Sequence, residues 1–446
     1  MYKSQRSGRN KNSYPSYSFI FKMKSLIRKI FPKPLFEFLL NKYHFLLAFL
    51  GALIYRFPSR KLKVIGVTGT NGKTTTVEMI SKILEQAGYK VAISSSIKFQ
   101  VGKKKWLNES RMTMPGRFAL QKLLRTAALN NCQYVVIEVS SEGILQHRHR
   151  FINFETAIFT NLSPEHIERH HCFENYRQAK GKLFQATKNI HIVNIDDENA
   201  EYFLQFPAKK KYLYKVKGQK AIIKIIDKNS KILEELEDLN INLKLLGNFN
   251  IYNALAAICV GMSQKISLEI CKKTMEKIEG IPGRMEEVIS QPFKVFIDYA
   301  ITPVALEKVY QTLSTNYLPA QAGKQVAKLI CVLGACGGGR DKWKRQIFGK
   351  IAAKYCDEII ITNEDPYDEN PIQILSMIKS GIQNLKATEI LDRREAIKKA
   401  LNLANKNDTI IITGKGCELW MCVEKGKKIP WNDREIVREE FKKLKK

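Results

Sequence analysis

The sequence of 446 residues is long enough for two or three domains with complete hydrophobic cores. Its 74 Lys and Arg against 43 Asp and Glu give a net charge of +31, which attracts phosphates, anionic lipids and nucleic acids alike. The basic residues are scattered over amphipathic helical patterns, and no aromatic and basic stacking module accompanies them, so the sequence argues against nucleic acid as a partner.

The first 60 residues differ from the rest. Basic residues are frequent up to Lys29, and residues 31–57 are then apolar and aromatic. The longest unbroken apolar stretch, 45–55, is too short to cross a bilayer, and the segment lacks the cleavage site of a secretory signal. Two interpretations stay open: an amphipathic helix on the anionic inner membrane surface, or a helix packed on the following domain, which the pattern favours.

Residues 66–76 read G-V-T-G-T-N-G-K-T-T-T and stand between the apolar run 63–65 and a helical pattern over 77–87. This order of strand, glycine-rich loop and helix is typical of a nucleotide-phosphate site, in which Lys73 reaches the terminal phosphates and Thr74 contacts Mg²⁺. The glycines fall at unusual positions for a P-loop, and the alternative is an ordinary glycine-rich turn. The pattern predicts ATP binding.

Strand-like aliphatic runs alternate with helical patterns along the chain. Such alternation predicts an α/β fold with parallel sheets and crossover helices. The runs cover residues 134–137, 157–160, 190–194, 295–298, 329–334, 358–362 and 409–413.

Nine cysteines stand singly in the sequence, and none belongs to a C-x₂-C pair. This spacing favours a reduced, cytoplasmic protein, and it argues against both disulfides and a structural zinc.

Two strand ends carry groups that could bind a metal. Glu138 follows the run 134–137, at the edge of the sheet where an ATP site places a metal ligand or an acid that positions water. His166 closes the segment after the run 157–160. Each has a simpler alternative, since Glu138 could lie on the surface and a single histidine is more often structural.

The segments 138–148, E-V-S-S-E-G-I-L-Q-H-R, and 159–166, F-T-N-L-S-P-E-H, resemble the UDP-N-acetylmuramoyl-tripeptide synthetases. These are the Mur ligases that add the third residue of the peptidoglycan stem peptide. The loop G-T-N-G-K-T-T is similar to that of Mur ligases and of folylpolyglutamate and cyanophycin synthetases. The similarity runs from about residue 61 to 446 through the segments 176–184, 194–197, 247–257, 282–286, 298–303, 334–345 and 414–418.

The resemblance implies an N-terminal segment 1–60, a central P-loop ATPase domain 61–283 and a Rossmann-like C-terminal domain 284–446. It implies Mg²⁺ ions bound near Thr74, Glu138 and His166, and a carbamylated lysine at Lys180 that is also a metal ligand. Without the resemblance, Lys180 would be taken for a surface lysine on a helix over 174–187. The residues implied to bind the nucleotide are Gly69, Thr70, Asn71, Gly72, Lys73, Thr74, Thr75, Asn250, Asn253 and Asp298, and those implied in catalysis are Lys73, Lys180, His166 and Arg284.

The same resemblance implies two substrate pockets. Thr113, Ser141, Gln146 and Arg148 match positions that hold the muramoyl peptide. For the incoming amino acid the matching residues are Arg340, Asp365, Tyr367, Gly414 and Glu418, of which the Arg340 fork suits a carboxylate.

Several departures from the family pattern bear on substrate choice. The diaminopimelate signature D-N-P-R reads E-D-P-Y here, so Tyr367 stands where the family has an arginine that grips a second carboxylate. Ile301 and Cys417 replace family histidines. About 60 residues precede the loop, fewer than the family's UDP-binding first domain needs, so we expect the uridine pocket to be missing or supplied differently.

The sequence therefore predicts a cytoplasmic, ATP- and Mg²⁺-dependent ligase that adds an amino acid to a UDP-muramoyl-peptide through an acyl phosphate. One alternative is a related ligase that acts on a lipid-linked or UDP-free acceptor, peripheral to the inner membrane face. The other is a ligase-inactive ATP-binding protein at the membrane surface, against which the joint presence of Lys73, Glu138, His166 and Lys180 argues.

Overall fold

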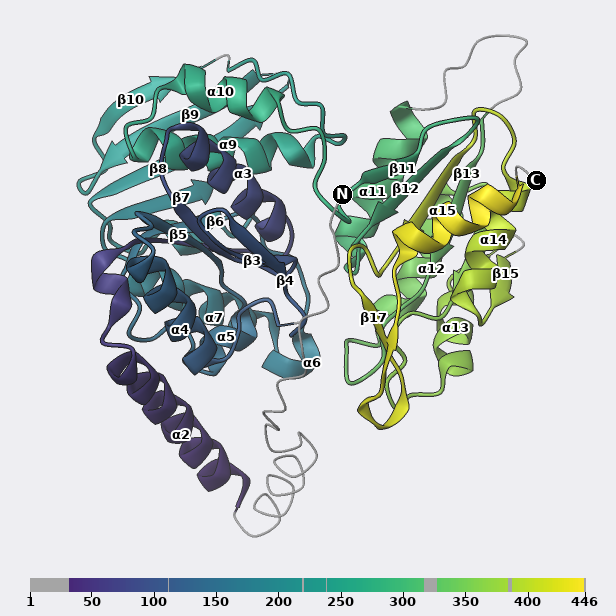
Figure 1. The fold of residues 1–446 in the computed structure, drawn as a ribbon, viewed down its shortest axis with the longest axis horizontal. Coiled ribbons are helices and arrows are strands. Elements are labelled where there is room, and N and C mark those ends of the chain that lie inside the picture. Colours follow the sequence, from purple (N-terminus) through teal and green to yellow (C-terminus); the bar gives the residue numbers. More distant parts are fainter. Residues whose placement is uncertain are drawn as a thin grey trace.

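The computed structural model describes residues 32–110, 112–218, 220–237, 239–316, 327–383 and 387–444. Two α/β units, each built on its own sheet, lie side by side (Figure 1). The predicted α/β class is confirmed, because both sheets have parallel centres joined by crossover helices.

The first unit contains a ten-stranded sheet in the order β10-β9-β8-β7-β6-β1-β5-β2-β3-β4. The six strands from β8 to β2 are parallel, whereas β9, β10, β3 and β4 add antiparallel hairpins at the two edges. The strands are β1 (Lys63–Thr68), β2 (Val91–Ser94), β3 (Lys98–Val101), β4 (Lys104–Leu107), β5 (Tyr134–Glu138), β6 (Phe154–Phe159), β7 (Ile190–Asn194), β8 (Lys210–Lys217), β9 (Lys220–Asp227) and β10 (Ile232–Leu236).

Helices cover both faces of this sheet. Side chains alternate along a strand, so Ile65 and Val67 of β1 face one apolar layer and Val64 faces the other. The first layer is closed by α3 (Lys73–Gln86), α9 (Phe249–Ser263) and α10 (Leu268–Glu276). The second is closed by α4 (Arg117–Leu129), α5 (Ser141–Leu145), α7 (Phe173–Ala186) and α8 (Ala200–Leu204), and the short α6 (Ile167–His170) precedes α7.

The second unit contains a six-stranded sheet in the order β11-β12-β16-β13-β14-β15, parallel except for β11. Its strands are β11 (Glu286–Ile289), β12 (Lys294–Asp298), β13 (Leu329–Leu333), β14 (Glu358–Thr362), β15 (Ala387–Ile390) and β16 (Thr409–Thr413). One face packs on α11 (Pro303–Asn316), α12 (Lys344–Tyr355) and α13 (Pro371–Lys379), and the other on α14 (Arg393–Leu403) and α15 (Asp433–Leu444). A hairpin of β17 (Trp420–Cys422) and β18 (Lys428–Pro430) follows β16.

The apolar N-terminal segment forms one helix, α2 (Lys33–Ile54), which extends away from the first unit (Figure 1). Ala48, Gly51 and Ala52 are buried where the C-terminal half of α2 packs against α4. At 22 residues, α2 is long and apolar enough to cross a membrane by length and composition alone. The expectation of an apolar stretch too short to span was therefore wrong, because the helix continues through Lys42 and His44. The basic residues up to Lys29 lie outside the described residues.

Cys331 and Cys356 form a disulfide, contrary to the expectation of unpaired cysteines. Cys331 lies on β13, and Cys356 directly follows α12, the helix that crosses back over the sheet after that strand. The two cysteines are 25 residues apart, and only the crossover brings them together. The other seven cysteines, all within the described ranges, are not disulfide-bonded.

Candidate active site

The loop between β1 and α3 is shaped by two glycines. Gly69 and Gly72 have φ of +149° and +81°, which L side chains rarely adopt. A Cβ on Gly69 would lie 1.9 Å from Thr160 Oγ1, and one on Gly72 would lie 2.3 Å from Asn253 Oδ1. The loop therefore fits against its neighbours only with glycine at both positions, and it leads into the N-terminus of α3, where backbone N–H groups suit an anion.

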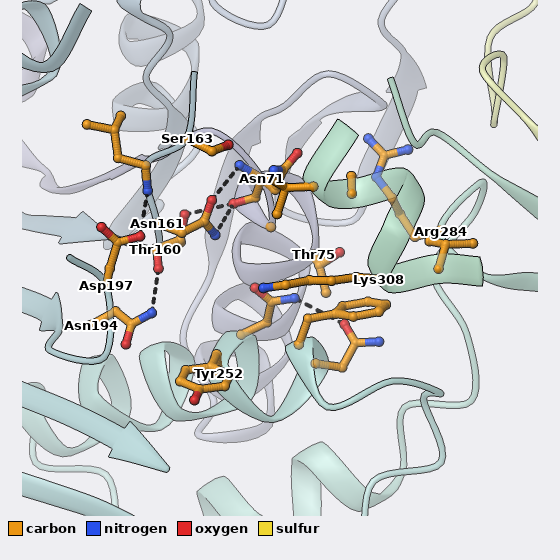
Figure 2. Close-up of a pocket in the computed structure, with 18 of the residues that line it drawn as sticks. Asn71, Thr75, Thr160, Asn161, Ser163, Asn194, Asp197, Tyr252, Arg284 and Lys308 are labelled. Atoms are coloured by element: carbon orange, nitrogen blue, oxygen red, sulfur yellow. Dashed lines mark hydrogen bonds between the residues drawn. The ribbon is translucent and has the colours of Figure 1, made fainter. Parts of the chain in front are cut away.

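The residues that follow β6 hold the loop from one side. Asn161 Oδ1 accepts a hydrogen bond from the backbone N–H of Asn71 at 3.0 Å, and Thr160 Oγ1 donates to the Asn71 carbonyl at 2.7 Å (Figure 2). From the second unit, Thr302 Oγ1 donates to Asn71 Oδ1 at 3.2 Å. Both units thus fix the conformation of the loop.

Two lysines converge on the same loop carbonyl. Lys73 Nζ donates to the carbonyls of Gly69 at 3.0 Å and Thr70 at 2.8 Å, and Lys180 Nζ donates to the Gly69 carbonyl at 2.8 Å. Lys180 is only 2% exposed, so the alternative of a surface lysine is wrong. Burial and the neighbouring charge of Lys73 hold the pKa of Lys180 well below its usual value. Burial also lowers the pKa of Lys73, although Glu138 opposes that effect.

Glu138 ends β5 and is fully buried. Its two oxygens accept hydrogen bonds from Ser96, one from the backbone N–H at 3.0 Å and one from the hydroxyl at 2.8 Å. The Ser96 hydroxyl also lies 3.1 Å from Thr113 Oγ1. Thr113 and Glu138 therefore belong to one polar cluster at the carboxyl end of the sheet.

His166 precedes α6 in a left-handed backbone conformation, with φ of +58°. Burial, followed by the charges of Arg340 and Lys180, lowers its pKa to about 2. The imidazole is therefore neutral at physiological pH, which is the form that binds metals.

The site contains few side chains that could bind Mg²⁺. Among the described residues, no three His, Cys, Asp or Glu side chains gather at one point. The hydroxyl of Thr74, the carboxylate of Glu138 and the imidazole of His166 nevertheless line one cavity with the phosphate loop. Mg²⁺ is usually held by one or two carboxylates together with substrate phosphates and water, so this donor set fits the ion.

Contacts from the second unit complete the phosphate side of the site. Arg284 Nη2 donates to Thr74 Oγ1 at 3.2 Å, and its guanidinium stacks on Tyr299 with 4.8 Å to the ring centroid. Lys344 Nζ donates to Glu165 Oε1 at 2.9 Å, and both side chains are almost completely buried. Asp341 accepts hydrogen bonds from the backbone N–H groups of α6. Sequence reasoning did not single out the Lys344–Glu165 pair, which joins the two units across the site.

A separate cavity opens beside the loop, between α9 and α11 (Figure 2). Asn253 Nδ2 donates to Asn250 Oδ1 at 3.1 Å on α9, and Thr76 Oγ1 donates to Asn253 Oδ1 at 3.3 Å. Across from them, Asp298 ends β12, and burial raises its pKa to about 6 although Arg284 opposes the shift. The predicted Thr75 lines this cavity as well, and so does Lys308 of α11, which sequence reasoning missed.

The predicted acceptor residues line the same cavity as the predicted phosphate and metal residues. Ser141, Gln146, Arg148 and Thr113 face it with Glu138 and the loop. The guanidinium of Arg148 donates to Gln146 Oε1 at 2.8 Å and to the Met114 carbonyl. Ser141 Oγ lies 3.0 Å from His170 Nε2.

A further cavity adjoins it, and Arg340 lines both. Lys415 is fully buried behind this second cavity, where it donates to Asp365 Oδ1 at 3.0 Å and to Glu418 Oε2 at 2.5 Å. Tyr367 and Glu364 also line it, and burial together with Asp365 raises the pKa of Glu364 to about 7. Gly414 packs against Glu364 of this cavity, since a Cβ on Gly414 would lie 2.5 Å from Glu364 Oε2.

Comparisons with known proteins agree with this geometry. The chain matches the Mur ligase middle domain over residues 67–261 and the Mur ligase, glutamate ligase domain over residues 283–416. It is 39% identical over 407 residues to the UDP-N-acetylmuramoyl-L-alanyl-D-glutamate–2,6-diaminopimelate ligase of Syntrophomonas wolfei, covering 88% of this chain and 81% of that protein. The corresponding ligase 1 of Clostridium acetobutylicum is 38% identical over 410 residues, covering 89% and 82%.

Two solved structures have the same fold. A UDP-N-acetylmuramoyl-L-alanyl-D-glutamate–2,6-diaminopimelate ligase has a TM-score of 0.53 at 27% identity, covering 86% of this chain and 79% of that one. The folylpolyglutamate synthase of Mycobacterium tuberculosis, solved with ADP and AMPPCP, has a TM-score of 0.61 at 15% identity, covering 82% and 92%. The chain belongs to the Mur ligase family.

Proposed function

We propose that this enzyme uses ATP to join an amino acid to the carboxylate of a UDP-N-acetylmuramoyl-peptide, through an acyl-phosphate intermediate. One observation carries the proposal. A single cavity is lined by the phosphate loop, by Glu138, His166 and Lys180, and by the acceptor residues, and it meets the amino-acid cavity at Arg340.

In the first step an acceptor carboxylate oxygen attacks the γ-phosphorus of ATP, the bond to the β,γ-bridging oxygen breaks, and ADP leaves. Lys73 and Arg284 would stabilise the charge on the transferring phosphoryl group. In the second step the neutral amine attacks the acyl carbon, phosphate leaves with the carboxylate oxygen, and the amine loses a proton. The contacts between the two units would exclude water, which would otherwise hydrolyse the acyl phosphate.

Thr74, Glu138 and His166 would hold Mg²⁺, which when bound offsets phosphate charge. We propose that Lys180 is carbamylated and adds an anionic ligand. Carbamylation needs a neutral amine, and burial and the charge of Lys73, which lower the pKa of Lys180, favour that form. The modification would also place an anion beside the ammonium of Lys73, whose Nζ shares the Gly69 carbonyl with Lys180.

For the nucleotide, we propose the cavity lined by Asn250, Asn253 and Asp298 as the nucleoside site, and residues 69–75 as the phosphate site. We further propose domains over 61–283 and 284–446. Each of these ranges contains one large sheet with its covering helices.

We propose that the amino acid is a monocarboxylate such as lysine, although the named relatives are diaminopimelate ligases. Arg340 would bind the α-carboxylate. The rest of the cavity carries Glu364, Asp365 and Glu418, and Tyr367 supplies a phenol where a second carboxylate would need a cation. Lys344 also lines the cavity but is paired with Glu165, and Lys415 is bound by Asp365 and Glu418, so neither lysine serves that purpose.

A second candidate substrate is a lipid-linked acceptor, and the contacts between α2 and the acceptor segment support it. His147 Nε2 lies 2.9 Å from Asn41 Oδ1 of α2, and Arg117 Nε donates to the Gln146 carbonyl while its guanidinium contacts His44 of α2. The helix therefore touches the acceptor segment. We propose a cytoplasmic enzyme whose residues 1–57 meet the inner membrane face.

The test is ADP release by the purified protein with a panel of UDP-muramoyl peptides and lipid-linked analogues, each crossed with amino acids. The proposal expects release only when a peptide acceptor and an amino acid are both present, and not in Lys73→Ala. Release that ignores the acceptor, or none across the panel, would contradict it and favour a ligase-inactive ATP-binding protein.

A further inference from the structure

The helix α2 is apolar on its outward side as well as where Ala48, Gly51 and Ala52 pack on the protein. Leu35, Leu39, Leu46 and Leu53 recur at spacings of four and seven residues, which place them on one face of a helix. They are 44%, 45%, 53% and 50% exposed. We call these four leucines the outer leucine face.

Asn41 and His44 lie on the other side of α2, whereas Lys42 is exposed on the same face as Leu39 and Leu46. Asn41 contacts His147, and His44 contacts Arg117, so both point to the body of the protein. A helix that packs on a soluble domain normally turns its apolar face inward. The outer leucine face is thus an apolar surface with no covering among the described residues.

Charges around α2 favour one kind of partner. Residues 1–31 contain eight Lys or Arg and no Asp or Glu. From Pro32 to Lys61 the exposed residues include Lys33, Lys42, Arg56, Arg60 and Lys61 against the single acid Glu37. A second copy of the chain would bring like charges together, whereas anionic lipid headgroups would neutralise them.

We propose that α2 docks on an anionic phospholipid bilayer, with the outer leucine face inserted at the headgroup boundary and the basic flanks on the headgroups. The helix lies along the surface rather than across the bilayer, because Asn41 and His44 stay bonded to His147 and Arg117 and the C-terminal half of α2 stays packed on α4. A helix of this length covers about 33 Å of surface.

This docking gives the acceptor cavity a fixed place at the membrane. The residue bonded to Asn41 lies between Gln146 and Arg148, which line the cavity. The inference rests on the proposed membrane-peripheral location of the enzyme and does not depend on the ligase reaction, so binding and turnover can be tested separately.

The experiment is co-sedimentation of the full chain with phosphatidylcholine vesicles, with and without phosphatidylglycerol. The test variant is Leu39→Glu/Leu46→Glu, and the matched control is Ile372→Glu, which changes a 60% exposed residue on α13. A second measurement places a probe in the face by Leu46→Trp and follows the added tryptophan fluorescence with brominated lipids. ADP release and sedimentation velocity report catalysis and oligomeric state.

We expect the parent chain and Ile372→Glu to bind anionic vesicles about tenfold better than neutral ones, and less well at high salt. The double variant should lose about tenfold in binding while keeping its ADP release, and brominated lipid should quench the new tryptophan. Equal binding by the double variant, no quenching of the introduced tryptophan, or a dimer that only the double variant dissociates would each overturn the proposal.

Discussion

The replacement of Lys180 by alanine tests the most unusual feature of the site. Lys180 is buried, and its Nζ contacts the Gly69 carbonyl at 2.8 Å in the loop that would hold phosphate. If the carbamate of Lys180 is a metal ligand that acts in the transition state, its removal resembles the loss of one preorganised electrostatic group. Such losses reduce kcat by about 10² to 10³, or roughly 3 to 4 kcal/mol.

The assay is steady-state ADP release with ATP, acceptor and amino acid. Lys180→Ala should show this loss, and short carboxylates such as acetate should restore part of the activity by occupying the space of the carbamate. Lys182→Ala is the matched control, since Lys182 is exposed on the same helix. A fold check by circular dichroism separates a catalytic loss from misfolding.

A direct readout accompanies the kinetics. Incubation with carbon-13-labelled bicarbonate should produce a carbamate signal by NMR in the parent chain and in Lys182→Ala, but not in Lys180→Met. Full activity of Lys180→Ala, or a carbamate signal that survives in Lys180→Met, would refute the reasoning.

Three further predictions concern the loop and the amino-acid cavity. Lys73→Ala should reduce ATP affinity at least about a hundredfold by calorimetry, because the phosphate charge loses its ammonium partner; unchanged affinity would contradict the P-loop assignment. Lysine should outcompete diaminopimelate in a mixed-substrate assay, and Tyr367→Arg should shift the preference towards diaminopimelate, because an unpaired buried carboxylate costs several kcal/mol. Burial raises the pKa of Glu364 from 4.5 to about 7, so its ionisation destabilises the fold as pH rises through that range. By 1.36 kcal/mol per pKa unit, Glu364→Gln should stabilise the protein by roughly 3 kcal/mol at pH 8 in denaturant unfolding, with the gain vanishing near pH 4.5; a gain independent of pH would contradict the shift.

The parts of the fold that follow from a continuous sequence pattern could be predicted, and the parts that depend on distant segments could not. The parallel strands β5, β7, β13, β14 and β16 are continuous aliphatic runs, so the sequence identified each to within a residue. Lysines interrupt the apolar residues of β8 and β9, which join in a hairpin, and the predicted runs omitted both strands. The disulfide was missed because it depends on the path of α12 rather than on spacing.

The site residues likewise divide into those that a local sequence pattern predicts and those that depend on contacts between distant segments. The loop from Gly69 to Thr74 was predicted from the residues alone, because strand, glycines and helix are consecutive. Lys180 had a signal that was not used, since Tyr176, Leu183 and Phe184 lie at helical spacing around it and are buried. The Lys344–Glu165 pair joins residues 179 positions apart, so no local pattern predicts it. The orientation of α2 was also beyond the sequence, because an apolar helix has the same composition whichever face it buries.

Oxygen transfer from the acceptor tests the central claim most directly. The acceptor peptide would be labelled with oxygen-18 in its reacting carboxylate, and the released phosphate analysed by mass spectrometry after turnover with ATP and the amino acid. The acyl-phosphate route predicts one labelled oxygen in phosphate for each amide formed, with an equal amount of ADP, because the attacking carboxylate oxygen stays on phosphorus. Unlabelled phosphate, or ADP released without a new amide, would contradict the account.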